Sequence, residues 1–523
     1  MATKNVSTEA DQGSRPAPNF RRRLLGAVPC DAGLWGLLAL LAYAIARSLI
    51  YARVRPLWFD ELLTQTVCRQ ANLLSIWKAL SQGVDGQPPF FYIVERTTAW
   101  LIPDEYIGYR LLSILGFACT LILLYVFVKT RSGATPAFIC ASLLLTTQLF
   151  TYYAVEARPY SMLTACIALA LVCYQRAPVG LWVGGMFVSL LVANMLHYYA
   201  VFFVLPFFLA ESTVLYKTKQ VRFGVWLALL VAPAPLIISL PLLLRLKQLW
   251  GAHFWNQSYL GPGYGTFFGS AAEWGTALAG TTVVALLASF ISATREPEDA
   301  RGSSAASVAE RVLILSLILL PIAAYTAVKI THAPFVNRYF LPAILGITAA
   351  VGYILARVKP RSIMLAAIFV LFLIGIQELL FWKSMHSGEA PFRRFADLAE
   401  VVHRESLPIV VSDFNTYVEV CHYAPPELRQ RILTLVDPGN VVVYTGTDTG
   451  EKIAVILRSY APVTVLDFAP FAASHPVFLL YSNRTGGDWW PRRLLHDGHH
   501  LQLLAGRGGD AMYLVELKTP TAN

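Results

Sequence analysis

Long apolar runs separated by short polar links dominate the sequence up to residue 381. The first run covers 34–51, and runs of about 17–25 residues, long enough to cross a bilayer as helices, follow it along the chain. They lie at 107–128, 134–151, 160–175, 179–196, 199–216, 223–244, 275–293, 310–330, 339–356 and 362–381. The sequence therefore predicts a mainly α, polytopic membrane protein with about eleven transmembrane helices.

After residue 381 the apolar runs become short and alternate with helical patterns. Short buried strands are predicted at 408–412, 431–436, 440–444 and 476–481, with a closing hairpin at 501–504 and 512–517. Helical spacing at 392–405 and 449–460 separates them. We expect residues 385–523 to form one small α/β domain.

Composition and charge agree with a membrane protein and indicate its orientation. Hydrophobic residues make up 56% of the chain and charged residues 14%, with a net charge of +10. The basic excess lies in residues 1–381, in links near 130, 176, 219, 300 and 359, which argues for membrane topology and against a nucleic-acid partner. The positive-inside rule places residues 1–30, a polar and disordered N-terminus, in the cytoplasm. It places the C-terminal domain on the exported face of the plasma (inner) membrane.

Two adjacent carboxylates follow the first apolar run, at the start of an exported link covering 57–106. Asp60 and Glu61 lie at a membrane boundary, where ionic groups are costly unless they serve a function. Such a pair could act as a general base, bind a cation or hold a substrate hydroxyl. The alternative is that both acids stabilise the N-terminus of an interfacial helix.

Two more exported links carry charged or aromatic residues that could meet these acids. Glu156 and Arg158 precede Pro159 and Tyr160, and they are interpreted either as site residues or as a local structural ion pair. His197 and Tyr198 occupy a very short link and could contact a polar substrate or simply pack at the interface.

A third link ends at Arg338 and Tyr339. A guanidinium at the membrane surface suits a lipid phosphate, because its planar fork can bind two phosphate oxygens, although Arg338 could also be an interfacial anchor. No His and Cys spacing indicates a metal site, and no glycine-rich nucleotide motif is present. All of these polar groups fall on one predicted membrane face.

Together these motifs resemble those of the GT-C membrane glycosyltransferases, in the branch of the protein O-mannosyltransferases and the lipid A aminoarabinose transferases. The resemblance covers residues 30–380, the greater part of the predicted transmembrane domain 31–381. Its carriers are Asp60 and Glu61, Gln87 before Pro88 and Pro89, Glu156 to Tyr160, and Arg338 to Pro342.

The resemblance implies transfer of a sugar from a polyprenyl-phosphate-linked donor, with inversion, to a hydroxyl of a glycan, lipid or protein acceptor on the exported face. It implies that Asp60 is the catalytic base, assisted by Glu156, and that Arg158 and Arg338 bind donor phosphate. Glu61, Gln87, Tyr160, His197, Tyr198 and Tyr339 are the further substrate-binding candidates. Relatives often carry His at the position of Gln87, so a divalent cation is not firmly expected. The competing interpretations are a lipid-linked-sugar transporter or flippase and a ligase that moves a whole glycan.

Overall fold

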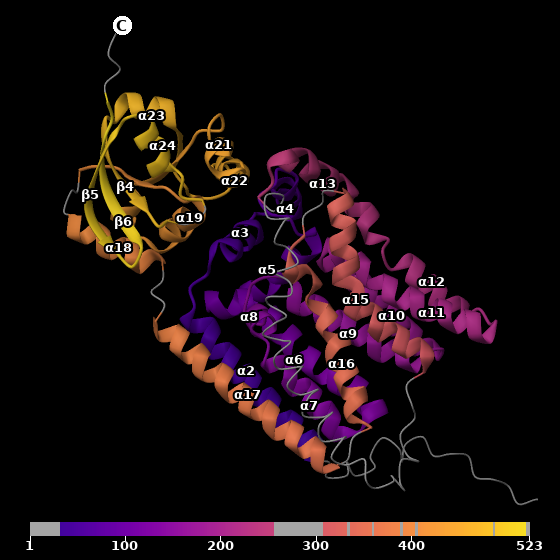
Figure 1. The fold of residues 1–523 in the computed structure, drawn as a ribbon. Coiled ribbons are helices and arrows are strands. Elements are labelled where there is room, and N and C mark those ends of the chain that lie inside the picture. The colour runs from indigo at the N-terminus through magenta and orange to yellow at the C-terminus, as the bar shows by residue number, and fades with distance from the viewer. Residues whose placement is uncertain are drawn as a thin grey trace, which may run out of the picture.

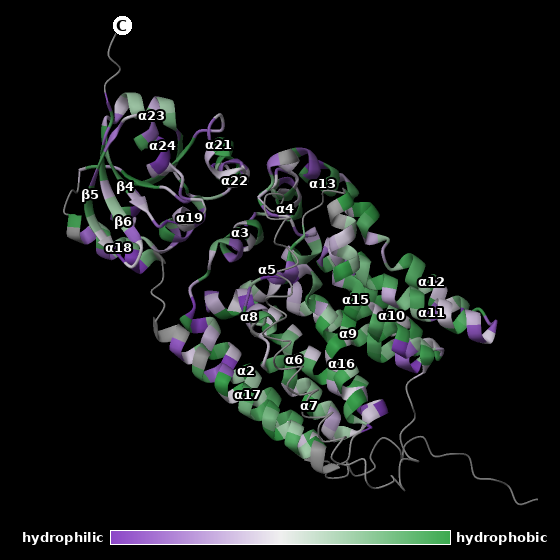
Figure 2. Ribbon diagram, in the orientation of Figure 1, coloured by the Kyte–Doolittle hydropathy of each residue, from purple (hydrophilic) through white to green (hydrophobic). Residues whose placement is uncertain are grey.

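The computed structural model describes residues 32–255, 307–331, 335–357, 360–387, 391–402, 406–484 and 487–518. Residues 32–387 form a helical body, and residues 391–518 form a C-terminal domain that packs on one end of it (Figure 1). The apolar residues concentrate along the helices of the body, while the C-terminal domain mixes polar and apolar positions (Figure 2). The predicted span at 275–293 and the predicted disordered stretch 1–30 lie outside the described residues.

Seven candidate membrane spans occur among the described residues, in agreement with the multi-pass helical fold that the sequence predicts. They are Gly33–Val54, Glu105–Ser132, Tyr198–Thr218, Phe223–Trp250, Val308–Ala327, Asn337–Leu355 and Ile363–Lys383. The corresponding helices of the body are α2 (Ala32–Val54), α6 (Glu105–Ser132), α11 (Val204–Thr218), α12 (Phe223–Val231), α13 (Pro235–Trp250), α15 (Val308–Thr331), α16 (Ile344–Leu355) and α17 (Pro360–Ser387). Shorter helices complete it: α7 (Ala134–Leu145), α8 (Gln148–Tyr153), α9 (Tyr160–Arg176) and α10 (Gly180–Leu196).

The central helix α6 shows how the sequence sets these boundaries. Its N-cap is Asp104, whose side chain accepts a hydrogen bond from the backbone N–H of Ile107. It ends at Gly133, whose φ of 83° suits a residue without a Cβ. In mid-helix, Gly116 allows close contact with α9, because a Cβ there would lie 2.7 Å from the backbone of Ser161. The tight α6–α9 contact fixes the segment between 153 and 160 that carries the candidate site.

Three short helices follow α2 at the end of the body that faces the C-terminal domain. They are α3 (Phe59–Cys68), α4 (Leu73–Ser81) and α5 (Pro89–Leu101). Asn72 caps α4 through a side-chain hydrogen bond to Ser75, and Pro89 begins α5 at a position where no intrahelical N–H donor is needed. Helix α3 carries Asp60 and Glu61 in its first turn.

The C-terminal domain contains a six-stranded sheet of order β3-β2-β1-β4-β6-β5. Its first four strands in this order are parallel, and β6 and β5 close it as an antiparallel hairpin. The strands are β1 (Ile409–Val411), β2 (Ile432–Val436), β3 (Val465–Asp467), β4 (Val477–Ser482), β5 (His500–Arg507) and β6 (Asp510–Glu516). The helices around them are α18 (Pro391–Val402), α19 (Phe414–Tyr423), α20 (Pro426–Arg429), α21 (Val441–Thr445), α22 (Thr449–Leu457), α23 (Phe468–Ser474) and α24 (Trp490–His496).

The strand predicted at 440–444 is wrong, because this stretch forms the one-turn helix α21. The valine run resembles a strand, but Asn440 and Val441 both donate backbone hydrogen bonds to the carbonyl of Asp437, which starts a helical turn. Gly446, with a φ of 73°, ends the helix. The sequence analysis also missed the three-residue strand β3.

A shared apolar core joins the C-terminal domain to the helical body. Phe59 and Leu62 of α3 belong to the same buried cluster as Val411 of β1 and Tyr417 of α19. The rings of Phe59 and Phe414 meet edge to face with centroids 5.8 Å apart. The first turn of α3 therefore packs directly against the C-terminal domain.

Candidate active site

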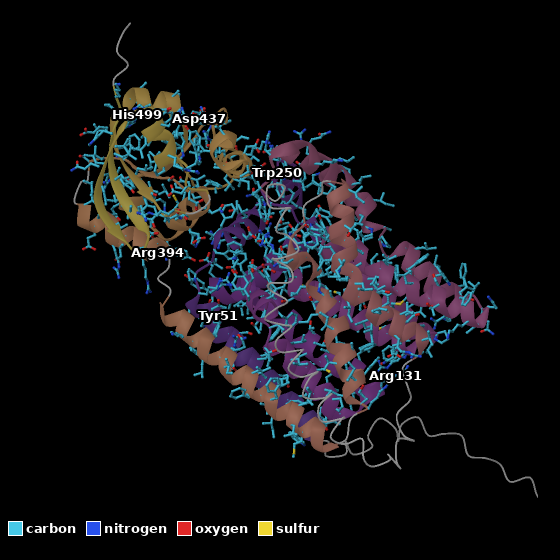
Figure 3. The ribbon with its side chains drawn as sticks, viewed as in Figure 1. Tyr51, Arg131, Trp250, Arg394, Asp437 and His499 are labelled. Carbon is cyan, nitrogen blue, oxygen red and sulfur yellow. The ribbon has the colours of Figure 1, made fainter. Side chains whose placement is uncertain are left out.

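A cavity of about 610 Å³ lies between the helical body and the C-terminal domain. We call it the boundary cavity. The helical body contributes Trp58 to Asp60, Leu63, Gly83 to Gln87, Arg158, Tyr160, Trp250, Phe254, Trp255, Arg338 and Tyr339. Trp250, at the end of α13, marks its edge on the side of the helices (Figure 3). A cavity of this volume is within the range of small-molecule sites.

Asp60 is the carboxylate that faces the boundary cavity, and two arginines flank it. Its Oδ2 lies 3.1 Å from a terminal nitrogen of Arg338, and its Oδ1 lies 3.4 Å from one of Arg158. The side chains are 13%, 17% and 4% exposed, respectively, so the acid and Arg338 are open to the cavity while Arg158 is nearly enclosed. Three elements distant in sequence, namely α3, the turn before α9 and the segment before α16, meet at this point.

Arg158 also pairs with a second carboxylate, that of Asp85, which lines the same cavity. Asp85 accepts the Arg158 hydrogen bond on Oδ2 and one from the backbone N–H of Gly86 on Oδ1. The sequence analysis did not select Asp85, although it lies only two residues before Gln87. Asp60 and Asp85 thus converge on one guanidinium, which neutralises part of their combined charge.

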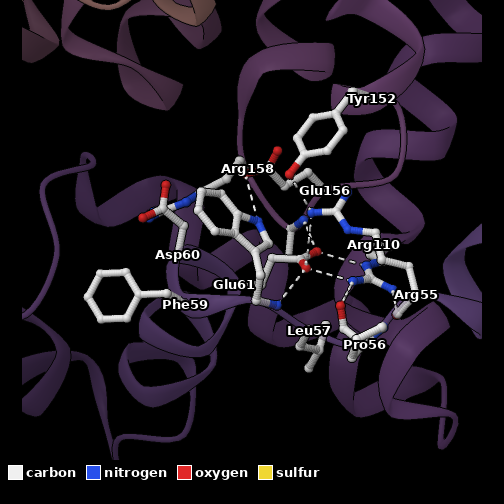
Figure 4. A network of polar contacts seen from close by, with 12 residues as sticks. Arg55, Pro56, Leu57, Phe59, Asp60, Glu61, Arg110, Tyr152, Glu156 and Arg158 are labelled. Atoms are coloured by element: carbon white, nitrogen blue, oxygen red, sulfur yellow. Dashed lines mark hydrogen bonds and ion pairs between the residues drawn. The ribbon is translucent and has the colours of Figure 1, made fainter. Parts of the chain in front are cut away.

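Glu61 points away from Asp60 into the helical body (Figure 4). Its carboxylate accepts two hydrogen bonds from Arg110, at 2.7 and 2.6 Å, one from the backbone N–H of Ala157 at 2.9 Å and one from that of Trp58 at 3.2 Å. Both Glu61 and Arg110 have fully buried side chains. These four donors fill the acceptor positions of the carboxylate, so Glu61 holds together the segments around the site. It does not line the boundary cavity, where the sequence predicts it as a substrate-binding residue.

Glu156 is also buried and does not line the boundary cavity. Its Oε1 accepts a hydrogen bond from the indole N–H of Trp58 at 3.2 Å. Burial raises the pKa of its carboxyl to about 8, even though the charge of Arg55 favours the ionised form. Glu156 therefore supports Trp58, next to Asp60, from outside the boundary cavity, and its assisting role stays a prediction.

The C-terminal domain holds the segment that precedes Asp60. The hydroxyl of Tyr423 accepts a hydrogen bond from the backbone N–H of Leu57 at 2.6 Å. The carboxylate of Glu419 accepts one from the backbone N–H of Phe59 at 3.1 Å. That N–H is one of the unpaired donors at the start of α3, so Glu419 caps this helix from the other domain. Neither residue had a signal in the sequence, because the partner is remote.

Six of the ten expected site residues line the boundary cavity: Asp60, Gln87, Arg158, Tyr160, Arg338 and Tyr339. Glu61, Glu156, His197 and Tyr198 do not. His197 is buried against the rings of Tyr160 and Tyr339, with centroids 5.6 and 4.8 Å away, and its Nδ1 accepts a hydrogen bond from the backbone N–H of Tyr199. His197 thus packs behind Tyr160 and Tyr339, which line the cavity, and substrate contact at His197 and Tyr198 stays a prediction.

In the part of the chain that the structure describes, no group of three or more His, Cys, Asp or Glu side chains is placed to hold a metal ion. Asp60 and Asp85 are the two carboxylates that converge in the site, but the guanidinium of Arg158 contacts both of them. A cation between them would have to displace that positive charge.

Comparison with known proteins gives structural matches alone: no family model and no curated protein sequence matches. The crystal structure of ArnT from Cupriavidus metallidurans in the apo state superposes with a TM-score of 0.52 over 91% of this chain and 98% of that chain, at 12% identity. The structure of the same protein bound to undecaprenyl phosphate gives a TM-score of 0.49 over 92% and 98%, at 13% identity. The match to apo ArnT shows that this chain has an ArnT-like GT-C fold, as the sequence resemblance implied.

Proposed function

We propose that this protein is a membrane glycosyltransferase that moves a sugar from a polyprenyl-phosphate-linked donor to an acceptor hydroxyl in the boundary cavity. The observation that carries this proposal is the carboxylate of Asp60 between the guanidinium groups of Arg158 and Arg338, at the edge of a bundle of membrane helices. One base and a phosphate-binding cation are the groups that such a transfer requires. The shared fold with ArnT supports it, since that protein was crystallised with undecaprenyl phosphate.

Arg338 is the proposed ligand of the donor phosphate. Its terminal nitrogen pairs with Asp60, while its Nε has no hydrogen-bond partner among the described residues. A phosphate can accept hydrogen bonds from Nε and a terminal nitrogen together, in the bidentate geometry that guanidinium groups favour. Binding of the donor would then draw Arg338 from Asp60 and leave one carboxylate oxygen free for the acceptor.

The transfer itself is a single displacement. The acceptor oxygen attacks the anomeric carbon, its proton passes to the carboxylate of Asp60, and the bond between the anomeric carbon and the phosphate oxygen breaks. Polyprenyl phosphate leaves with the electron pair, and Arg338 and Arg158 stabilise the charge that develops on it. Attack opposite to the leaving phosphate inverts the anomeric carbon.

Binding of undecaprenyl phosphate to purified protein tests the donor role. Arg338→Ala should weaken binding by about 2–5 kcal/mol, because a buried charged contact is lost. Arg338→Lys should retain part of the affinity, since it keeps the charge and loses the fork. The control is Arg458→Ala, which removes a surface ion pair with Asp467 in the C-terminal domain. Unchanged affinity in Arg338→Ala would refute the assignment.

The proposed orientation places the N-terminus in the cytoplasm and the C-terminal domain on the exported face of the plasma membrane. It rests on the distribution of Lys and Arg among the links. Val443 lies in the C-terminal domain and is 79% exposed. Tyr216 lies near the C-terminal end of α11, next to the link that we place in the cytoplasm, and is 75% exposed. A membrane-impermeant thiol reagent applied to intact cells should label Val443→Cys and not Tyr216→Cys; the opposite pattern would reverse the orientation.

A further inference from the structure

The wall of the boundary cavity opposite the membrane helices comes from the carboxyl ends of parallel strands. Ser412 and Asp413 follow β1, and Thr434 to Val436 end β2. The chain runs from β1 to β2 and β3 on one side and then returns to β4 on the other, so the sheet changes direction at β1. Open parallel sheets bind ligands at the carboxyl ends of their strands, next to this switch point.

None of the described residues of this wall carries a positive charge. Its described residues are Ser412, Asp413, Phe414, Asn415, Thr416, Thr434, Leu435, Val436, Val441, Thr445, Thr447, Thr449, Gly450, Glu451, Ile453, Ala454, Gly487, Trp489 and Trp490. The charged members of this set are two acids, Asp413 and Glu451. Asp413 accepts hydrogen bonds from the backbone and side chain of Thr416, and Glu451 accepts two from the backbone N–H of Asp437. The two arginines of the cavity lie on the opposite wall, around Asp60.

This division of charge separates two kinds of ligand group. A phosphate matches the arginine wall, whereas on the other wall it would meet Asp413 and Glu451 without a counter-ion, at a cost that grows as water is excluded. The second wall offers instead the exposed amide of Asn415, beside Ser and Thr residues of which Thr416, Thr434, Thr445 and Thr447 already donate their hydroxyl hydrogens to acceptors in the protein. The amide of Asn415 both donates and accepts hydrogen bonds, and the hydroxyl oxygens can still accept them, so both kinds of group suit sugar hydroxyls.

Aromatic side chains complete this surface. Trp250 and Trp255 from the helical body and Trp489 from the C-terminal domain line the cavity. Large aromatic rings give apolar contact area to the C–H faces of a sugar ring, while neighbouring polar groups fix its orientation. Gln87 adds a further polar group: it is 7% exposed, lines the cavity, and its Oε1 has no hydrogen-bond partner among the described residues. A sugar hydroxyl is a suitable donor for this oxygen.

We propose that the acceptor is an uncharged, hydroxyl-rich saccharide that binds between the Asn415 wall and Asp60, and that its attacking group is a sugar hydroxyl rather than a phosphate. This inference rests on the proposed function and specifies its acceptor. The hydroxyl oxygen forms the new glycosidic bond, its proton passes to Asp60, and polyprenyl phosphate leaves. A phosphorylated acceptor would meet no cation among the described residues of this wall.

Saturation-transfer NMR on the full chain, in nanodiscs titrated to saturation with undecaprenyl phosphate so that the arginine wall is occupied, tests this proposal with mannotetraose and its 6-phosphate as probes. The neutral probe should bind at least tenfold more tightly than the phosphorylated one. Asn415→Trp, which places a large ring in the cavity from an exposed helix position, should weaken binding of mannotetraose by tenfold or more. The matched control is Leu503→Trp, since Leu503 is 58% exposed on β5 and does not line the cavity; it should change affinity by less than twofold.

A charge-adding variant provides an independent readout. Asn415→Lys supplies the missing cation, so it should raise the affinity for the 6-phosphate and narrow the difference between the probes. The proposal is overturned if wild type binds the 6-phosphate as tightly as mannotetraose, if neither probe binds, or if Asn415→Trp behaves like Leu503→Trp. Undecaprenyl phosphate binding in the same preparations separates failure of the acceptor proposal from failure of the proposed function. If Arg338→Ala weakens undecaprenyl phosphate binding but no saccharide binds, only the acceptor proposal is rejected. If Arg338→Ala leaves undecaprenyl phosphate binding unchanged, the proposed function is rejected.

Discussion

Asp60 and Glu61 are adjacent in sequence, but their substitution should affect different properties of the protein. Asp60→Asn removes a charge at the cavity surface, where both arginines keep access to solvent or to another partner. Arg158 retains its pair with Asp85. Glu61→Gln instead removes a fully buried charge from a bidentate pair with Arg110. We therefore expect the first variant to lose activity and the second to lose stability.

The magnitudes follow from burial. Loss of one partner from a fully buried ion pair leaves an uncompensated charge and costs about 3–5 kcal/mol. In Glu61→Gln the new amide also points N–H groups toward Arg110 or the backbone N–H of Ala157, both of which are donors. The ion pairs of Asp60 are longer, at 3.1 and 3.4 Å, and its side chain is 13% exposed whereas that of Glu61 is fully buried, so Asp60→Asn should cost less stability than Glu61→Gln. Its turnover should fall by about 10²–10⁴-fold, as expected for loss of a general base.

The assay compares both variants in one detergent or nanodisc preparation. Thermal unfolding followed by tryptophan fluorescence measures stability, and transfer from lipid-linked donor extracted from the host membrane measures turnover. Arg458→Ala is the control, because it removes only a surface ion pair with Asp467 and should leave both stability and turnover unchanged. Equal stability loss at Asp60 and Glu61, or normal turnover in a folded Asp60→Asn protein, would refute the reasoning.

Three further predictions concern residues around the site. Burial raises the pKa of Glu156 to about 8, so between about pH 5 and 8 the folded protein keeps a proton on this carboxyl that the unfolded chain releases. The free energy of unfolding should therefore fall as pH rises from about 5 to 8. Thermal unfolding of Glu156→Gln should depend less on pH over this range. Glu419→Ala removes the acceptor for the Phe59 N–H and should change kcat more than it changes KM. Glu419→Gln keeps an acceptor oxygen and should retain much of the wild-type kcat. Equal kcat values in the two variants would contradict the capping role. Gly116→Ala should destabilise the α6–α9 contact by about 1–3 kcal/mol in the same unfolding assay, since its Cβ would lie 2.7 Å from the backbone of Ser161, and an unchanged midpoint would show that the helices can separate at little cost.

The sequence predicts the fold well where periodicity and length carry the information. The membrane helices and most strands of the C-terminal domain follow from apolar spacing and turn residues. The errors arise where local pattern and tertiary context disagree, as in the valine run at 441–443, which has strand composition but begins at a turn set by Asp437.

For the site, composition identified charged residues at the membrane boundary but could not say which way each side chain points. Asp60 and Glu61 differ by one position on a helix, about 100° apart, so one faces the cavity and the other faces Arg110. The roles of Glu419 and Tyr423 could not be predicted from the sequence, for a different reason. They act on backbone groups more than 350 positions away in the chain, and such contacts leave no pattern in the local sequence.

The contact of Glu419 and Tyr423 with the segment before Asp60 has a consequence for biosynthesis. Ribosomes make the transmembrane helices first, so the acid enters the membrane boundary long before the residues that cap its helix exist. The C-terminal domain also supplies one whole wall of the boundary cavity. Each nascent chain is thus expected to remain inactive until its C-terminal domain has folded onto the helical body, and a prematurely terminated chain should insert in the membrane with the boundary cavity incomplete.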